Sequence, residues 1–305
     1  MTRVAAVDCG TNSVRLLVAD VDGDRLTDVE RRMEIVRLGQ DVDRTGRLAP
    51  EALERTFTAM RGYRKLLDQH GVTATRVVAT SATRDAANRA DFVAGVREIF
   101  GVDPEVVTGD EEAQLSFTGA TKTLPGTPPF LVVDIGGGST EFVLGSAGAE
   151  AAISVDIGCV RLTERHLRDS GDPPAREAVE AVIADIEAAL DRVHEVVPGE
   201  RARTLVGLAG SVTTVAGIAL GLPEYDPARI HHSRIPAAQV HEVTRRLLTM
   251  THDERAAVPV MHPGRVDVIG AGALILDRIV RRFGFAEVMV SEHDILDGIA
   301  WSILS

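Results

Sequence analysis

Short apolar runs alternate along the chain with longer stretches in which apolar residues recur at helical spacing. The short runs predict strands at residues 4–7, 14–20, 76–80, 105–108, 153–157 and 205–208, and another that begins at residue 130. The periodic stretches predict helices at residues 51–70, 92–100, 111–121, 160–168 and 173–197, and one that follows Ser211. Because strands and helices alternate in both halves, we expect an α/β fold.

Two segments of the chain have nearly the same sequence. Residues 4–17 read VAAVDCGTNSVRLL, and residues 130–144 read FLVVDIGGGSTEFVL. Each segment is an apolar run, an aspartate, a turn rich in Gly, Ser and Thr, and a second apolar run, which predicts a strand, a turn and a returning strand. Asp8 aligns with Asp134, and Arg15 aligns with Glu141. The repeat therefore predicts two related lobes whose turns face each other across a cleft.

The segment Leu124–Pro129 contains three prolines and a glycine and is typical of a linker. It predicts an N-terminal domain at residues 1–124 and a C-terminal domain at residues 125–305, with the last helix free to pack back on the first domain. A chain of 305 residues is long enough for two domains with separate cores.

The composition indicates a globular protein of the cytoplasm. Hydrophobic residues make up 45% of the chain and charged residues 26%, and no apolar run approaches the roughly 20 residues that cross a bilayer. Asp8 interrupts the first apolar run, which is unlike a secretory signal, and two cysteines, Cys9 and Cys159, suit a reducing compartment. A net charge of −12 argues against nucleic-acid binding. It does not exclude an anionic substrate, because the electrostatic field at the binding site matters more than the net charge of the chain.

Three turns contain residue types that are typical of phosphate-binding loops. Glycine lets a backbone approach an anion closely, and amides at a helix N-terminus attract one. A single turn of this kind is better explained as an ordinary hairpin or a helix cap, but three in one chain predict a substrate with several phosphates. The turns contain Gly10, Thr11, Asn12 and Ser13, then Gly136, Gly137, Gly138 and Ser139, and finally Gly210 and Ser211.

Several charged residues could have either a functional or a purely structural role. Arg84 follows a buried strand and could reach a cleft or cap a surface helix. Glu111 and Glu112 begin a helix, where acids suit the dipole. Neighbouring helix residues point about 100° apart, so one of the two could face a cleft and accept a proton from an attacking water. Asp294 and Asp297 could line the cleft or cap the final helix, as could His293, and we favour capping and packing.

Six motifs occur in order: DCGTNSVRLLV, ATSATRDAAN, TGDEEAQLSF, VVDIGGGSTEFV, IGCVRLTE and GLAGSVTT. Together they resemble the exopolyphosphatase and guanosine pentaphosphate phosphohydrolase family, in its short two-domain form. The resemblance covers essentially the whole chain. This family is part of the actin-like ATPase and sugar kinase superfamily, so the resemblance implies two ribonuclease-H-like domains with a cleft between them.

The resemblance also implies roles for single residues. Glu112 matches the catalytic base, and Arg84 matches an arginine that contacts phosphate. Asp134 and Glu141 match carboxylates associated with a divalent metal, Mg²⁺ or Mn²⁺, and Asp8 matches an aspartate that faces the metal or its waters. The three turns above match the phosphate-binding loops.

The implied activity is release of terminal orthophosphate from inorganic polyphosphate by metal-assisted attack of water. Three alternatives stay open: a guanosine pentaphosphate (pppGpp) 5′-phosphohydrolase, an ATP-dependent kinase or ATPase of the wider superfamily, and a regulator that binds polyphosphate, pppGpp or ppGpp without turnover. The presence of Glu112 favours an enzyme over a regulator, since binding alone needs no acid that activates water. We expect no nucleic-acid or membrane partner, and a homodimer is left open.

Overall fold

The computed structural model describes residues 2–23 and 25–303 of the chain. The described residues form two compact units. The first consists of Met1–Gly119 and Asp294–Ser305, and the second of Ala120–His293. The sequence placed the boundary between residues 124 and 125 instead, a little beyond this division, and the last helix belongs to the first unit.

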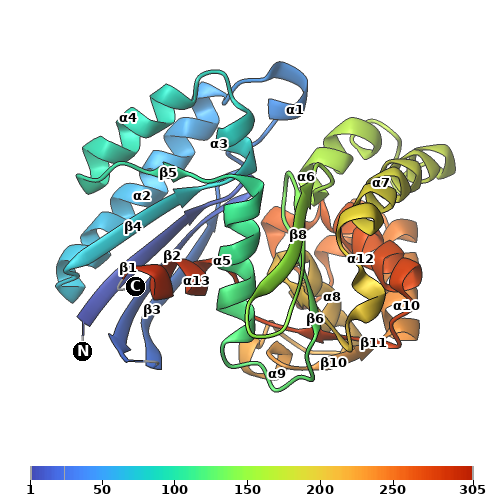
Figure 1. Cartoon of the computed structure of the whole chain (residues 1–305). Helices are drawn as coiled ribbons and strands as arrows, with labels where there is room; N and C mark the ends of the chain where they lie inside the picture. The colour runs from blue at the N-terminus through green and yellow to red at the C-terminus, as the bar shows by residue number, and fades with distance from the viewer. Residues whose placement is uncertain (1, 24, 304–305) are drawn as a thin grey trace. The chain divides into compact units, whose positions relative to one another are not determined.

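The first unit is built on a five-stranded sheet of order β3-β2-β1-β4-β5 (Figure 1). β1 (Thr2–Cys9), β2 (Ser13–Asp22) and β3 (Arg25–Ile35) are antiparallel neighbours. β4 (Ala74–Ala79) pairs in parallel with β1, and β5 (Glu105–Val106) pairs in parallel with β4. The carboxyl ends of β1, β4 and β5 therefore lie at one edge of the sheet.

Helices cover both faces of this sheet. Residues of β1 alternate between the faces: Ala5, Val7 and Cys9 pack in the core that includes α2 and α4, whereas Val4 and Ala6 pack against α13. A central strand that is buried on both faces reads as a continuous apolar run, which is why the sequence predicted it. The helices of the unit are α1 (Val42–Thr45), α2 (Pro50–His70), α3 (Ser81–Asp85), α4 (Arg89–Phe100), α5 (Gly109–Thr121) and α13 (Ile295–Ser302).

Two glycines bring α5 and α13 into close contact. A Cβ atom at Gly298 would lie 2.0 Å from the carbonyl oxygen of Leu115, and one at Gly119 would lie 1.8 Å from the carbonyl oxygen of Asp294. Only glycine fits at either position, so α13 fixes the place of α5 within the first unit.

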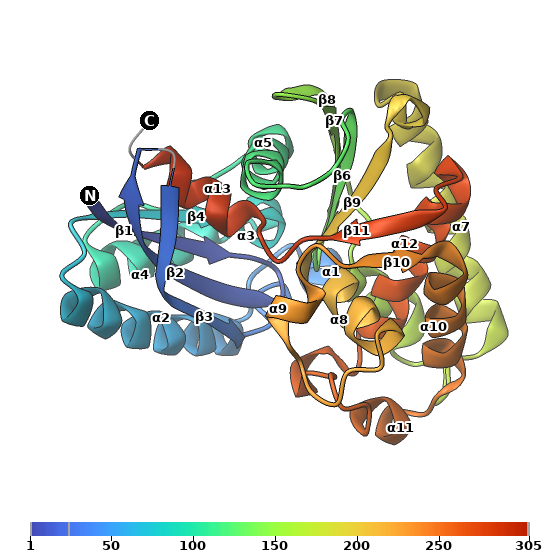
Figure 2. The same ribbon diagram turned by 90° about the horizontal axis from the view of Figure 1, so that it is seen from below.

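The second unit repeats the topology of the first. Its sheet has the order β10-β11-β9-β6-β7-β8, in which β8-β7-β6-β9-β11 corresponds to β3-β2-β1-β4-β5 (Figure 2). β6 is antiparallel to β7 and parallel to β9, as β1 is to β2 and β4. The strands are β6 (Phe130–Ile135), β7 (Thr140–Gly145), β8 (Ala149–Val155), β9 (Thr204–Leu208), β10 (Arg234–Pro236) and β11 (Glu287–Val290). The α/β fold and the duplication expected from the sequence are confirmed.

One large core joins the helices of the second unit to its sheet. These helices are α6 (Cys159–Leu162), α7 (Arg176–Val196), α8 (Ala209–Ala219), α9 (Pro227–Ile230), α10 (Ala237–Thr249), α11 (His252–Ala256) and α12 (Ile269–Phe283). A π-helical turn, η1 (Thr163–Leu167), continues α6, and the 3₁₀ turns are η2 (Gly199–Arg201) and η3 (Pro263–Arg265).

Most predicted elements are present, with differences at their ends, but several elements, among them β3, β10, β11, α10 and α12, were not predicted. β3 was not predicted, because its sequence RLTDVERRMEI is charged and largely exposed along the edge of the sheet. The strand expected at residues 105–108 has only two residues. The helix expected at 160–168 begins at Cys159 and changes to π-helical geometry at Thr163.

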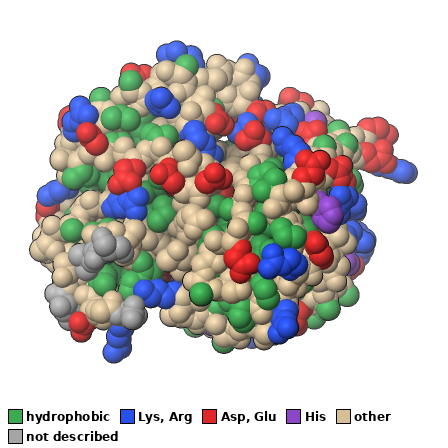
Figure 3. Space-filling view, viewed as in Figure 1, with side chains coloured by type: hydrophobic (Ala, Val, Ile, Leu, Met, Phe, Trp, Pro, Cys, Tyr) green, Lys and Arg blue, Asp and Glu red, His purple; other side chains and the backbone are tan. Residues whose placement is uncertain are grey.

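The surface carries charge of both signs. Basic (Lys and Arg) and acidic side chains are interspersed on the face shown in Figure 3. Of the helices in the described part of the chain, none combines the length and apolar character that a bilayer crossing requires.

Candidate functional site

The turn between β1 and β2 has its carbonyl groups tied to a later segment. The carbonyl of Thr11 accepts a hydrogen bond from the amide of Gly39 at 2.8 Å. The carbonyl of Asn12 accepts from Val36 and Arg37 at 3.0 and 2.9 Å. Among the described residues, the amides of Thr11 and Asn12 have no backbone acceptor. Adjacent N–H groups that a turn leaves unused form a concavity suited to an anion.

The turn between β6 and β7 is held in the same way. The carbonyl of Gly136 accepts from Cys159 at 3.0 Å, and that of Gly137 accepts from Val160 and Arg161 at 2.9 and 3.0 Å. Within residues 2–23 and 25–303, no backbone acceptor is found for the amides of Gly137 and Gly138. The repeated sequence thus produces a repeated arrangement, in which a later segment binds the carbonyls of the turn and two adjacent amides have no backbone acceptor among the described residues.

Two further contacts fix the second turn. Nε of Arg161 donates to the carbonyl of Gly138 at 2.7 Å. A Cβ atom at Gly158 would lie 2.3 Å from the carbonyl oxygen of Gly137, so this approach requires glycine. The IGCVRLTE motif therefore serves as the support of the glycine-rich turn.

The third turn lies at the sheet edge next to the second. Asp134 is the parallel partner of Leu208, the last residue of β9, and α8 begins at the next residue. Ser211 is buried beneath α12, because a Cβ atom at Gly272 would lie 2.2 Å from its hydroxyl oxygen. The structure thus brings Asp134 and the segment with Gly210 and Ser211 to one edge of the sheet in the second unit.

Arg265 is a residue that the sequence analysis missed. Its guanidinium covers the third turn, since a Cβ atom at Gly210 would lie 2.3 Å from Nη2 of Arg265. No acidic partner pairs with Arg265 in the described part of the chain. Arg265 lies in η3, far from any predicted strand or turn, so no local pattern could have identified it.

In the first unit, Arg84 and Glu112 form an ion pair. Nη1 of Arg84 donates to Oε2 of Glu112 at 3.0 Å. The elements that carry them, α3 and α5, follow the adjacent strands β4 and β5. α3 also touches the first turn, because the hydroxyls of Thr11 and Ser81 lie 2.9 Å apart. The first turn, Arg84 and Glu112 are therefore grouped at one sheet edge.

The two adjacent glutamates of α5 have different surroundings. Oε2 of Glu111 accepts from the amide and the hydroxyl of Thr108 at 2.8 and 3.0 Å. These hydrogen bonds hold the pKa of Glu111 below its ordinary value. Glu112 points inward and is 8% exposed. Glu111 is therefore the capping residue, and Glu112 is the acid that faces the interior.

The repeated hairpins differ in charge at one position. Asp8 faces Arg15 across the first hairpin, and Asp134 faces Glu141 across the second. Oδ2 of Asp8 accepts from Nε and Nη2 of Arg15 at 2.9 and 2.7 Å. Burial raises the pKa of Asp8, and the charge of Arg15 opposes this effect. Ser154 donates to Oε1 of Glu141 at 2.7 Å.

Two buried side-chain oxygens near the first turn fit a hard cation that takes its other ligands from water and phosphate. Oδ1 of Asp8 is buried without a hydrogen-bond partner in the described structure, and so is the side-chain oxygen of Asn12. Such oxygens suit Mg²⁺ or Mn²⁺, which accept one or two carboxylates together with waters and phosphate oxygens. No group of three or more His, Cys, Asp or Glu side chains among the described residues could hold a metal alone.

The acids near the last helix cap it, as the sequence analysis favoured. Oδ1 of Asp294 accepts from the amide of Leu296 at 3.0 Å, and Oδ2 of Asp297 accepts from the amide of Asp294 at 3.0 Å. His293 belongs to the second unit, where its ring lies 4.5 Å from that of His231.

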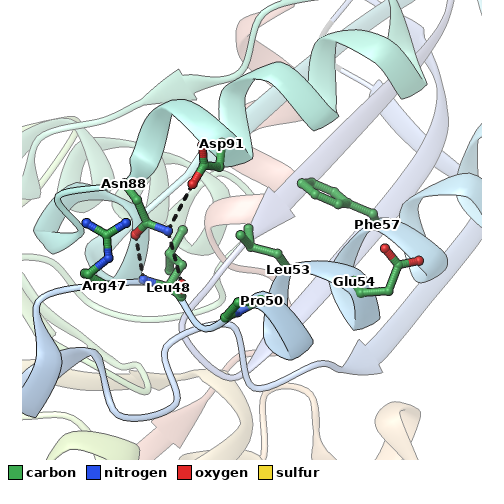
Figure 4. A pocket seen from close by; sticks show the side chains of 8 residues that line it. All are labelled: Arg47, Leu48, Pro50, Leu53, Glu54, Phe57, Asn88 and Asp91. Carbon is green, nitrogen blue, oxygen red and sulfur yellow. Dashed lines mark hydrogen bonds between the residues drawn. The ribbon is translucent and has the colours of Figure 1, made fainter.

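A pocket of about 390 Å³ lies in the first unit beside the start of α2 (Figure 4). Asn88 closes one side: it accepts from the amide of Leu48 at 2.8 Å and donates to the carbonyl of Leu48 at 3.1 Å and to Asp91 at 3.2 Å. None of the candidate residues named above lines this pocket, so it is not part of the candidate site. Its lining is Arg47, Leu48, Pro50, Leu53, Glu54, Phe57, Asn88 and Asp91.

Comparison with known families decides the assignment. The model of the Ppx/GppA phosphatase family matches residues 17–305. The chain belongs to the Ppx/GppA phosphatase family. The resemblance stated from the motifs is therefore confirmed, and the chain is a member of a family of phosphatases.

Curated relatives agree with this assignment. Exopolyphosphatase 2 of Mycobacterium tuberculosis is 50% identical over 317 residues, with 99% of each chain covered. The bifunctional 3-dehydroquinate synthase/phosphatase of Fusobacterium nucleatum is 33% identical, and the match covers 96% of this chain but 45% of that protein.

Solved structures of Ppx/GppA proteins share the fold. The crystal structure of an exopolyphosphatase-like protein matches with a TM-score of 0.94 and 41% identity over 98% of each chain. The Ppx/GppA family member of Aquifex aeolicus matches with a TM-score of 0.84 and 31% identity, over 99% of this chain and 97% of that one. The prediction of two ribonuclease-H-like domains of the actin-like ATPase type is confirmed.

Proposed function

We propose that this protein is an exopolyphosphatase, which releases terminal orthophosphate from inorganic polyphosphate by attack of water. The protein named Exopolyphosphatase 2, which is similar over the full length, supports this substrate. The observation that carries the proposal is the Glu112 carboxylate, buried at the start of α5 and paired with Arg84.

Glu112 is proposed to act as the general base. A carboxylate at hydrogen-bond distance from a water can accept its proton as the water attacks. The new bond joins the water oxygen to the terminal phosphorus, and the bond to the bridging oxygen breaks. The shortened chain leaves with the electron pair of that oxygen.

The unused amides and the arginines are proposed to bind the phosphates. Phosphoryl transfer depends mainly on positioning and on neutralising charge. In the first unit these groups are Arg84 and the amides of Thr11 and Asn12. In the second unit they are the amides of Gly137 and Gly138, and Arg265 above the third turn. Arginine suits this task because its planar fork matches phosphate oxygens.

A divalent cation is proposed as the cofactor, held by Asp134 and Glu141, with Asp8 facing it or its waters. When bound, Mg²⁺ or Mn²⁺ would neutralise phosphate oxygens. The unpaired Oδ1 of Asp8 supports this assignment, because a buried acceptor without a donor is costly unless a ligand satisfies it.

The test is phosphate release from polyphosphates of defined length and from pppGpp, with Mg²⁺ present or chelated by EDTA. We expect release from polyphosphate that needs the metal. Faster release from pppGpp would instead identify a pppGpp 5′-phosphohydrolase. Binding of either compound without release would indicate a regulator and would contradict the proposal.

A further inference from the structure

Arg15 lies between two buried carboxylates from opposite ends of the chain. Its Nε and Nη2 atoms donate to Oδ2 of Asp8 at 2.9 and 2.7 Å, and its Nη1 atom donates to Oδ2 of Asp294. Asp8 is 3% exposed and Asp294 is 4% exposed. All three residues belong to the first unit.

The second carboxylate changes the charge of this cluster. Arg15 with Asp8 alone would be a neutral pair, whereas Arg15 with Asp8 and Asp294 carries one net negative charge. Buried charges interact strongly because little solvent screens them. The cluster therefore attracts a cation, although a guanidinium is bound directly to Asp8.

The geometry leaves one atom to bind that cation. Both bonds from Arg15 to Asp8 end on Oδ2, while Oδ1 is buried without a hydrogen-bond partner among the described residues. Asp294 binds the remaining terminal nitrogen of Arg15, and this contact orients the guanidinium group of Arg15. Oδ1 of Asp8 is thus turned away from Arg15.

We propose that Asp294 is a positioning residue for cation binding. It holds Arg15 in place and supplies the negative charge that keeps Oδ1 of Asp8 attractive to a divalent cation or its waters. This inference rests on the proposed function, in which Asp8 faces the metal.

A purely structural role for Asp294 can be separated from this one. Its Oδ1 atom caps α13 and its Oδ2 atom binds Arg15, so the two tasks use different oxygens. Asn is as good an N-cap as Asp. Asp294→Asn therefore keeps the cap and removes the charge.

Asp297 offers a matched control. It lies in the same helix and takes part in the same capping box, and it pairs with Arg31 at 2.6 Å instead of Arg15. Asp297→Asn removes a buried charge of the same kind that is not bound to Arg15 or Asp8, and the Asn oxygen can still accept from the amide of Asp294.

The experiment is a titration of the full chain with Mn²⁺ alone, in which electron paramagnetic resonance measures the free ion. We expect Asp8→Asn and Asp294→Asn to weaken Mn²⁺ binding about tenfold, and Asp297→Asn to change it less than about twofold. Glu at position 294 restores the charge, so Asp294→Glu should recover part of the affinity. In turnover assays the Asp294→Asn protein should need more Mg²⁺ for half-maximal rate.

The outcomes separate this inference from the proposed function. If Asp8→Asn weakens Mn²⁺ binding and Asp294→Asn does not, the role of Asp294 is wrong and the role of Asp8 stands. If Asp8→Asn binds Mn²⁺ like the unaltered protein, the assignment of Asp8 fails and this inference fails with it. Circular dichroism checks folding, and Asp294→Ser, which also caps, replaces Asp294→Asn if that variant is unfolded.

Discussion

Nη1 of Arg84 lies 3.0 Å from Oε2 of Glu112, and the same nitrogen also donates to the carbonyl of Val107 at 3.0 Å. One guanidinium therefore ties the start of α5 to the end of the neighbouring strand. This contact orients the carboxylate of Glu112, as its proposed role of general base requires.

Glu112→Gln should lower the rate of polyphosphate hydrolysis roughly 10²–10⁴-fold, because an amide cannot accept the proton of the attacking water. Steady-state phosphate release measures the rate, and thermal unfolding checks that the fold is retained. Glu111→Gln is the matched control, since Glu111 caps α5 at the exposed neighbouring position. Equal rates for the two variants would show that Glu112 is not the base.

Gly158→Ala should destabilise the second unit by about 1–3 kcal/mol, because the added methyl group would lie 2.3 Å from the carbonyl oxygen of Gly137. Relief of this clash must move the glycine-rich turn, so phosphate release should fall as well. Urea unfolding measures the loss. Gly148→Ala is the control, because nothing lies within 4 Å of a Cβ atom there. A Gly158→Ala protein as stable as the control would contradict the close approach.

Asn88→Ala should lower the free energy of unfolding by about 1–3 kcal/mol, because it leaves the amide and the carbonyl of the buried Leu48 without their partner. Hydrolysis at saturating polyphosphate should stay near the unaltered rate, since no candidate residue lines this pocket (Figure 4). Arg47→Ala at the rim should change stability by less than about 0.5 kcal/mol. A large loss of activity in the folded Asn88→Ala protein would instead link the pocket to catalysis.

The stability of the second unit should depend on pH through Asp185. Burial tends to raise the pKa of Asp185, but hydrogen bonds from His166 and Arg165 outweigh it and hold this pKa below its ordinary value. A carboxylate whose pKa is lowered on folding stabilises the fold above the unfolded value of about 3.9, and the contribution disappears as the pH falls below it. The stability difference between the unaltered protein and Asp185→Asn should therefore shrink between about pH 5 and pH 2.5.

Urea unfolding across that pH range measures the dependence. Asp169→Asn, a change at an exposed residue near the same helical turn, should show no such trend. If the stability difference between the unaltered protein and Asp185→Asn stays constant with pH, the contacts with His166 and Arg165 do not lower the pKa of Asp185.

The sequence predicted the parts of the fold and the candidate site that depend on local pattern. The turns at Gly10 and Gly136 are recognisable because glycine, hydroxyl and acid follow one another directly in the chain. Arg84 was singled out because it follows a buried strand, and Glu112 because it is one of two adjacent acids at the start of a helix. Their ion pair was not predicted, because it depends on the order of β4 and β5 in the sheet.

Two other features depend on pairing between distant segments. Arg265 reaches Gly210 from a short 3₁₀ turn that has no distinctive sequence. The contact of Arg15 with Asp294 spans 279 positions, and nothing local to either residue indicates it. β3 was missed for another reason: an edge strand that faces solvent needs no apolar alternation.

α13 packs against β1 and closes the core that contains Val4 and Ala6. This face of β1 therefore lacks its helix until residues 295–300 have been made. The first unit, although most of its residues are made first, must therefore wait for the last helix before this core can close. Loss of α13 would therefore damage the half of the protein that is synthesised first.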